Sequence, residues 1–299
     1  MSRVHAFFDF DDTLLDGDSI LYWLRFYYQR RPSRRIFQVM NWAALVGFSL
    51  KLIDSHTLKR ILLFPMGWEH PEELDRLAAE FVRTDLASHF HAPVLQRLWT
   101  HHLLGHKIVI LSASATFYLR HLKAFLPMAD IQGSEIIWQK PGSFSIPRYK
   151  DGNLRGENKI TRMRALGYGS AAPLSFAYSD HHHDIFLLRF SEFPFCIRPT
   201  PKLHRLAIAE GWPVIDWPGN LPRWKIRLGK LRLLLFAAGP VRSATCDPVR
   251  EAARAREYAP TQVRELAAVV SRKYSRATNP QVHADIFGTY SMASPTIEF

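Results

Sequence analysis

The sequence predicts an α/β fold: a parallel sheet covered by helices, with a helical insertion after the first strand and a basic helical extension at the C-terminus. Short apolar runs alternate with stretches of helical periodicity, which is typical of parallel sheets with helical cover. Residues 19–104 are helical in pattern and too long for a simple crossover, so they are expected to form an inserted cap. The core is then expected to span residues 1–18 and 105–218, and the basic extension residues 219–299.

Four apolar runs predict buried strands, at residues 4–8, 107–111, 174–178 and 193–197. Helices are predicted at residues 115–125 and 159–166, and two short strands at residues 134–138 and 143–147 around a Pro-Gly turn. The last 50 residues are polar with three prolines, and a fourth, Pro248, comes just before them. We expect this part of the chain to be helical at first and then loose.

Composition narrows the class of protein. The 299 residues are 47% hydrophobic and 22% charged, close to globular averages, which excludes a mostly disordered chain. Two cysteines cannot build a disulfide framework, and no CxxC motif suggests a zinc site. The N-terminus lacks the pattern of a signal peptide, so a cytoplasmic protein is expected.

The positive charge is concentrated near the C-terminus. The chain has a net charge of +12, and residues 219–299 hold 13 basic and 6 acidic residues, a net +7. Within residues 223–236, basic residues alternate with Trp, Ile and Leu and then give way to an apolar stub. This pattern fits a helix on an anionic membrane surface, or a helix packed on the domain with a solvated basic face.

A second unusual stretch, residues 36–50, carries no charge. As a helix it would be about 22 Å long, short of the roughly 30 Å of a bilayer core. Four arginines, Arg30, Arg31, Arg34 and Arg35, come just before it, as an anionic surface would favour. The sequence leaves two alternatives open, a core helix of the cap or an interfacial helix.

Polar residues follow three of the predicted strands. Asp9 and Asp11 end the first, Ser112 ends the second, and Asp180 ends the third. Open α/β sheets place their ligand sites at the carboxyl ends of the strands. Crowded carboxylates repel unless a cation lies among them, and hard oxygen ligands suit Mg²⁺.

The same residue types can transfer a phosphoryl group. A carboxylate can attack phosphorus to form an aspartyl-phosphate, while a second carboxylate protonates the leaving oxygen and then activates water. Ser112 and Lys159, the latter near the start of a predicted helix, can hold the charge of the transferring group.

These motifs resemble the haloacid dehalogenase (HAD) superfamily over roughly residues 4–217. The resemblance rests on the DxDxT that begins at Asp9, the apolar strand that ends in Ser112, Lys159, and the DxxxD from Asp180 to Asp184. The early helical insertion resembles the C1 cap of its phosphoserine-phosphatase-like subfamily IB, on a Rossmann-like core. The narrower resemblance is to phosphatidylglycerophosphate phosphatases.

The resemblance implies roles for the acidic residues and Thr13. Asp9 would be the nucleophile and a Mg²⁺ ligand. Asp11 would be the general acid and base, with its backbone carbonyl on the metal. Asp180 would be a further metal ligand, Asp184 would position Lys159 or a metal-bound water, and Thr13 would support the loop.

The resemblance also implies the substrate contacts. Ser112 would bind the phosphoryl oxygens and Lys159 would neutralise both Asp9 and the phosphate. Ala113 is expected beside them, and Asp18 is expected at the entrance to the site. Arg25, Lys59 and Arg60 of the cap could meet an anionic substrate, although solvated cap positions are the alternative.

Two positions depart from the family pattern. Ser179 stands where the family usually has Gly, and His181, the first of three consecutive histidines, where it often has Ser. We expect Ser179 to crowd the loop without removing a ligand. The His run is expected to be a solvated loop beside the cleft, with a metal site as the alternative.

The sequence therefore predicts a Mg²⁺-dependent phosphomonoesterase that forms an aspartyl-phosphate, at or near a membrane, with an amphiphilic phosphate such as a phospholipid headgroup as substrate. One alternative is a soluble phosphatase of small metabolites such as phosphoserine, and another is a basic binding module on an inactive HAD scaffold. An anionic membrane surface, contacted through residues 36–50 and 223–236 at the inner membrane, ranks above nucleic acid as a partner. The sequence predicts no oligomeric state.

Overall fold

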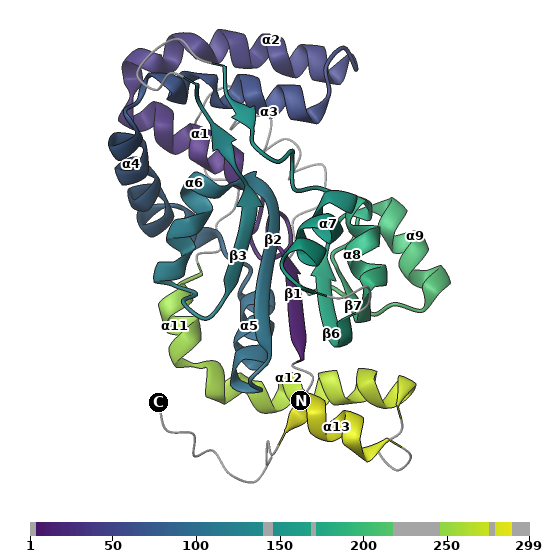
Figure 1. Ribbon diagram of the computed structural model, residues 1–299. Coiled ribbons are helices and arrows are strands. Elements are labelled where there is room, and N and C mark those ends of the chain that lie inside the picture. The colour runs from purple at the N-terminus through teal and green to yellow at the C-terminus, as the bar shows by residue number, and fades with distance from the viewer. Residues whose placement is uncertain (1–3, 140–145, 169–171, 218–245, 275–278, 289–299) are drawn as a thin grey trace.

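The computed structural model describes residues 4–139, 146–168, 172–217, 246–274 and 279–288. A six-stranded parallel sheet forms the centre of this described part, with strand order β3-β2-β1-β6-β7-β8 (Figure 1). Its strands are β1 (His5–Asp9), β2 (Lys107–Ala115), β3 (Asp130–Ser134), β6 (Ala172–Ser179), β7 (Ser191–Ile197) and β8 (Val214–Ile215). A separate antiparallel pair joins β4 (Ile136–Ile137) to β5 (Arg148–Tyr149).

The four predicted strands are confirmed as β1, β2, β6 and β7, with ends that differ by a few residues. Strands β3 and β8 were not predicted, because β3 has the polar sequence DIQGS and β8 is only two residues long. The helix expected over residues 115–125 is instead a short helix α6 (Thr116–Leu119) followed by a 3₁₀ turn. Residues 143–145 of an expected strand lie outside the described residues.

Alternate residues of the central strands supply the two faces of the core. Phe8 and Ile110 face one layer, which contains α5 (Ala92–Leu103), α6 and α12 (Ala255–Lys273). Phe7 and Val109 face the other layer, formed by α7 (Glu157–Ala165), α8 (Ile185–Phe190) and α9 (Pro201–Glu210) (Figure 1). Strands buried on both faces explain the near-continuous apolar runs in the sequence.

The predicted helical insertion is confirmed, and it lies over the carboxyl ends of the strands (Figure 1). It contains α1 (Ser19–Arg30), α2 (Gln38–Ser49), α3 (Ser55–Leu63), α4 (Pro71–Thr84) and intervening 3₁₀ turns. The last helix of the predicted insertion, α5, does not lie with these helices, because it contacts β2 and α12. We therefore propose that the cap ends before α5, near residue 91, and that α5 belongs to the core.

Helix α2 contains most of the uncharged stretch, and it is not a core helix. Only Asn41 and Ala44 are buried among its residues. Asn41 donates a hydrogen bond of 2.8 Å to the hydroxyl of Tyr28, so a polar side chain fixes α2 to the cap. The core alternative is wrong because the apolar side chains point mainly outward. In the described part of the chain, no helix combines the length and apolar character needed to cross a bilayer.

The C-terminal helices are confirmed as α11 (Pro248–Ala253), α12 and α13 (Pro280–Phe287). They lie at the end of the sheet opposite the cap (Figure 1). Leu266 and Val270 of α12 are buried in the core, and Arg97 of α5 lies 2.5 Å from Glu265. The helical part of the expectation is therefore confirmed for residues 248–273, which pack on the core. The predicted surface helix at 223–236 lies outside the described residues.

A chain of buried hydrogen bonds connects α13 to the sheet. His106 Nε2 lies 2.5 Å from the carbonyl of Ile286, which can only accept, so Nε2 carries the proton. Burial lowers the pKa of His101 and His106, that of His106 to about 4, so both imidazoles are neutral at pH 7. His106 Nδ1 then accepts from His101 Nδ1 at 2.8 Å, and His101 Nε2 accepts from the hydroxyl of Tyr178 at 2.7 Å.

This chain predicts acid sensitivity. Because the pKa of His106 is about 4 in the fold and 6.5 when exposed, the unfolded chain binds more protons between these values. Stability present above pH 6.5 is thus lost as the pH falls. We expect His106 alone to lower the free energy of unfolding by about 2 kcal/mol between pH 7 and pH 5. Urea unfolding should show a shallower pH dependence in His106→Asn, and parallel curves would contradict the assignment.

Candidate active site

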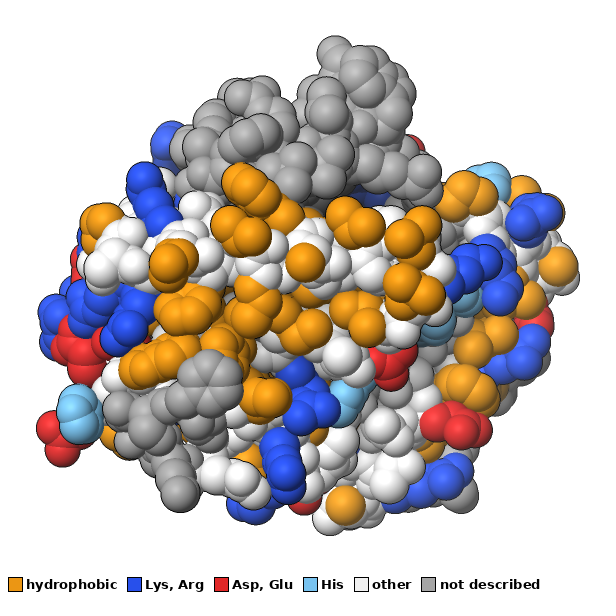
Figure 2. Space-filling view, turned by 90° about the horizontal axis from the view of Figure 1, so that it is seen from above, with side chains coloured by type: hydrophobic (Ala, Val, Ile, Leu, Met, Phe, Trp, Pro, Cys, Tyr) orange, Lys and Arg blue, Asp and Glu red, His pale blue; other side chains and the backbone are white. Residues whose placement is uncertain are grey.

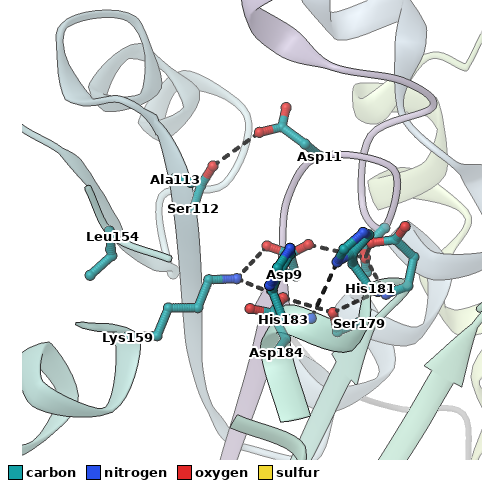
Figure 3. Close-up of polar contacts among 12 residues, drawn as sticks. Asp9, Asp11, Ser112, Ala113, Leu154, Lys159, Ser179, His181, His183 and Asp184 are labelled. Carbon is teal, nitrogen blue, oxygen red and sulfur yellow. Dashed lines mark hydrogen bonds and ion pairs between the residues drawn. The ribbon is translucent and has the colours of Figure 1, made fainter. Parts of the chain in front are cut away.

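A cavity of about 430 Å³ lies where the carboxyl ends of the central strands meet the cap. Its floor contains Asp9, Asp11, Lys159, Asp180 and Asp184, so the structure gathers acids from two strand ends and the lysine of a predicted helix. Ser112, predicted at the same edge, is fully buried and is not among the lining residues. The grouping follows from the parallel sheet, in which β1, β2 and β6 all end at the same edge. Figure 3 shows the side chains of Asp9, Asp11, Lys159 and Asp184 at close range.

The Lys159 side chain holds the acids of the floor together. Its Nζ donates to Asp9 Oδ1 at 2.6 Å and to Asp184 Oδ2 at 2.8 Å (Figure 3). Only 2% of the Lys159 side chain is exposed. Gly156, with φ +59°, precedes α7 and lets the chain turn into the helix that presents Lys159.

Burial and the Lys159 charge act in opposite directions on the pKa of Asp9. Burial raises the pKa of Asp9 to about 7, the Lys159 ammonium opposes this rise, and the neighbouring Asp184 and Asp11 carboxylates add to it. For Lys159, burial favours the neutral amine, but Asp184 and Asp9 outweigh it and raise its pKa. The lysine is thus a fixed cation, while the Asp9 carboxylate is incompletely compensated by it.

Thr13 and Asp180 complete the floor on the other side of Asp9. Thr13 Oγ1 lies 3.4 Å from Asp9 Oδ2 and 3.3 Å from Asp180 Oδ1, and it accepts the backbone N–H of Asp180 at 3.0 Å. The hydroxyl therefore ties the loop after β1 to the end of β6. It also holds two carboxylate oxygens close to one point.

Asp11 points away from this group, toward β2 (Figure 3). Its Oδ1 accepts the backbone N–H of Ser19 at 2.7 Å, and its Oδ2 accepts from the hydroxyls of Ser114 and Ser112, the latter at 3.4 Å. Ser112 is fully buried and accepts the backbone N–H of Ser114 at 2.9 Å. Sequence reasoning missed Ser114, whose one signal was a second hydroxyl two residues beyond Ser112.

Ser179 fits the loop without a clash. It is fully buried, and its hydroxyl donates to Asp184 Oδ2 at 2.7 Å. The same oxygen receives Lys159, so Ser179 holds the carboxylate that in turn holds the lysine. The departure from the usual glycine thus adds a positioning contact.

The three histidines lie beside the cavity, and His181 and His183 line it. Their ligand nitrogens lie within 4.8 Å of one another, but the rings stack. The His181 and His183 rings are 4.6 Å apart with planes only 18° from parallel. Nitrogen lone pairs lie in the ring planes, so those of two stacked rings do not converge on one ion. The arrangement does not match a preformed metal site.

The cap contributes to the cavity unevenly. Lys59 lines it, and its Nζ donates to the backbone carbonyl of Ala113 at 3.1 Å. Asp18 also lines the cavity while its carboxylate caps α1. Arg25 and Arg60 are the other two cap residues that, from the sequence, could meet the substrate. Arg25 forms an ion pair of 2.5 Å with Asp85, and Arg60 donates to the carbonyl of Pro147 at 2.8 Å. Neither belongs to the cavity lining, whereas Arg155, which the sequence did not suggest, does.

The donor set of the floor fits a divalent cation such as Mg²⁺. Asp9 and Asp180 supply hard carboxylate oxygens held near Thr13. The raised pKa of Asp9 shows that Lys159 alone does not offset its burial and the nearby acids. A bound cation would supply the missing positive charge and favour the carboxylate.

Lys159→Met should be costly, because it leaves Asp9 and Asp184 buried without their cation. We expect a loss of about 3–5 kcal/mol in the free energy of unfolding at neutral pH. Arg162→Met on the same helix is the matched control. Arg162 lies 3.3 Å from Asp151 in an exposed pair, and its loss should cost less than about 1 kcal/mol. Similar losses in both variants, measured by chemical denaturation, would contradict the central role of Lys159.

Comparison with known proteins supports the same family. The profile of the haloacid dehalogenase-like hydrolases matches residues 6–189. A histidinol-phosphatase of Neisseria meningitidis is 22% identical over 71% of this chain and 98% of its own length. A probable phosphatase of Mycobacterium tuberculosis is 24% identical over 72% of this chain and 76% of its own length.

Solved structures share the fold. A Bordetella pertussis protein of unknown function superposes with a TM-score of 0.62 at 23% identity, covering 72% of this chain and 99% of that one. A HAD family hydrolase of Salmonella enterica gives a TM-score of 0.51 at 13% identity, covering 78% of this chain and 70% of that one. With the matched residues spanning β1 to α8, the chain belongs to the haloacid dehalogenase-like hydrolase family.

Proposed function

We propose that the protein is a Mg²⁺-dependent phosphomonoester hydrolase that works through an aspartyl-phosphate on Asp9. The observation that carries the proposal is the buried contact of Lys159 with Asp9 and Asp184 at the floor of an open cavity. A fixed ammonium beside a carboxylate can hold both the nucleophile and the negative charge of a phosphoryl group. Family membership supports the hydrolase and the divalent metal.

In the first step, a carboxylate oxygen of Asp9 attacks phosphorus and the bond from phosphorus to the alcohol oxygen breaks. Asp11 gives a proton to that oxygen, and the alcohol leaves. Ser112 and Lys159 stabilise the charge on the phosphoryl oxygens. In the structure, the backbone N–H of Ser19 and the Ser114 hydroxyl donate to the Asp11 carboxylate and fix its position beside β2.

In the second step, water attacks the phosphorus of the aspartyl-phosphate. Asp11, now a carboxylate, takes a proton from that water, and the Asp9 carboxylate leaves with release of inorganic phosphate. Asp9, Asp180 and the backbone carbonyl of Asp11 would hold Mg²⁺, which neutralises phosphate charge when bound. Asp184 and Ser179 act through Lys159, whose position they fix.

The cap side of the cavity suggests the class of alcohol. Apolar residues of three cap helices line it: Ile20, Leu21, Leu45, Phe48, Leu58 and Leu62. A phosphate at Asp9 would therefore extend an apolar group against the cap. This arrangement favours an amphiphilic phosphomonoester, of which phosphatidylglycerophosphate or a lysophospholipid with a terminal phosphate is the lipid form.

A soluble metabolite phosphate is the second candidate. It is favoured by the Neisseria relative named a histidinol-phosphatase, which this chain matches over nearly its full length. Asp12 and Asp18 line the cavity and could receive the ammonium group of an amino-alcohol phosphate. The family match and the filled catalytic positions favour either enzyme over an inactive scaffold that only binds.

Asp9→Asn should abolish hydrolysis, because the amide is not a competent nucleophile. We expect Mg²⁺-dependent release of phosphate from an aryl phosphate to fall by at least about 10³-fold. Asp151→Asn, at a surface carboxylate, should keep wild-type activity. If wild type and Asp9→Asn are equally inert across soluble and lipid phosphates, the binding-module alternative gains and the enzyme proposal fails.

Chain length should separate the two substrate classes. Octyl phosphate has six more methylenes than ethyl phosphate. Burial of only two of them is worth about 1.6 kcal/mol, so octyl phosphate should exceed ethyl phosphate in kcat/KM by at least about tenfold. Phe48→Ser should reduce this preference. Phe186→Ser is a matched control, because Phe48 is 41% exposed and Phe186 45% exposed, but Phe186 lies outside the cavity lining. A preference for histidinol phosphate over octyl phosphate would favour the soluble class.

A further inference from the structure

We propose that the outer face of α2 docks on an anionic lipid surface and turns the mouth of the cavity toward it. The inference deepens the proposed function, and it rests on that function only in taking the substrate to be an amphiphilic phosphate. The exposed side chains of this face play no part in the chemistry.

The apolar stripe of α2 points outward. Val39, Trp42, Val46 and Leu50 recur at helical spacing and are all exposed. Ile36 before the helix and Leu52 after it extend the stripe, with 73% and 75% of their surfaces exposed. Figure 2 shows a broad band of hydrophobic side chains over this face of the cap. A water-facing helix normally shows the opposite pattern, so this face is suited to an apolar partner.

The charges around the stripe favour a polyanionic partner. From residue 19 to residue 53 the chain has six Lys or Arg and no Asp or Glu. Arg30 forms an ion pair with Glu80 of α4, and Arg31 forms one with Glu69 just before α4. The other basic residues next to the stripe are Arg34 and Arg35 before it and Lys51 after it. Arg35 and Lys51 are exposed. Cations at both ends of an uncharged helix match an anionic bilayer surface.

The dimensions favour a helix lying flat. With 12 residues, α2 is about 18 Å long, too short to cross the roughly 30 Å of hydrocarbon. An outward apolar face with basic flanks and an exposed Trp42 is typical of helices at the headgroup boundary. The face would thus insert shallowly, without spanning.

The same helix connects this face to the cavity. Leu45 and Phe48 line the cavity, and Phe48 is also exposed. The apolar wall of the cavity therefore continues onto the outer surface at the end of α2. An amphiphile held in a bilayer could pass its phosphate toward Asp9 while its apolar part stays against the cap. A protein partner or a second copy of the chain would not require this continuity.

The test uses the full-length protein and vesicles of phosphatidylcholine with and without phosphatidylglycerol. We expect sedimentation with the anionic vesicles, and Val39→Glu/Val46→Glu should weaken the partition coefficient by at least about tenfold. Val249→Glu/Ile208→Glu is the matched control. It adds the same charge at residues of similar exposure outside the cap, and Val39 and Val249 are each 62% exposed. Hydrolysis of ethyl phosphate should be unchanged in both double variants.

Three results would overturn the inference. Wild type fails to bind anionic vesicles, or both double variants lose binding equally, or binding is lost only when the five Lys and Arg of residues 223–232 are neutralised. A dimer in light scattering that Val39→Glu/Val46→Glu converts to a monomer, with no change in vesicle binding, would assign the face to a second copy.

Asp9→Asn separates this inference from the proposed function. It should bind vesicles like wild type while failing to hydrolyse phosphate. Vesicle binding through α2 by a wild type that hydrolyses no phosphomonoester would leave the docking face standing and remove the enzyme. Hydrolysis of phosphomonoesters without vesicle binding would support the enzyme and remove the docking face.

Discussion

The buried Lys159 ammonium is the interaction on which the site depends. It lies between Asp9 and Asp184, and three segments distant in sequence must meet for that contact to form: the end of β1, the start of α7 and the turn after β6. Burial first, and the neighbouring carboxylates second, raise the pKa of Asp9 despite this ammonium, so one cation shared by two buried carboxylates leaves negative charge uncompensated. That excess is what a divalent metal and then a phosphoryl group can use. The floor thus pairs a fixed positive charge with an acid that is not fully compensated.

The core chemistry was predictable because it follows from short motifs and from strand topology. Asp9, Ser112 and Asp180 end apolar runs, and parallel strands bring such ends to one edge. The contacts that support them were not predictable. Ser114 on Asp11 and Ser179 on Asp184 depend on side-chain directions that a one-dimensional pattern does not contain. Strand β3 escaped prediction for a similar reason, since its pairing with β2, and not its own residues, makes it a strand.

The cap and the C-terminus show how burial decides between equal sequence patterns. An uncharged helix can be buried or interfacial, and α2 exposes its apolar stripe because Asn41 and Ala44, not the larger residues, face inward. The last helices look polar, yet α12 buries Leu266 and Val270 against α5, at the end of the sheet opposite the cap. The two ends of the molecule therefore differ in burial. The C-terminal helices complete the core, whereas α2 of the cap presents an apolar surface beside the cavity.

The central claim is a covalent bond between phosphorus and Asp9, and borohydride trapping during turnover tests it most directly. An acyl phosphate is reduced to an alcohol, so peptide mass spectrometry should find homoserine at position 9 when Mg²⁺ and a phosphomonoester are both present. Omission of the substrate should leave Asp9 unchanged. Sustained phosphate release with an unmodified Asp9 would mean that water attacks the substrate directly, and would contradict the account.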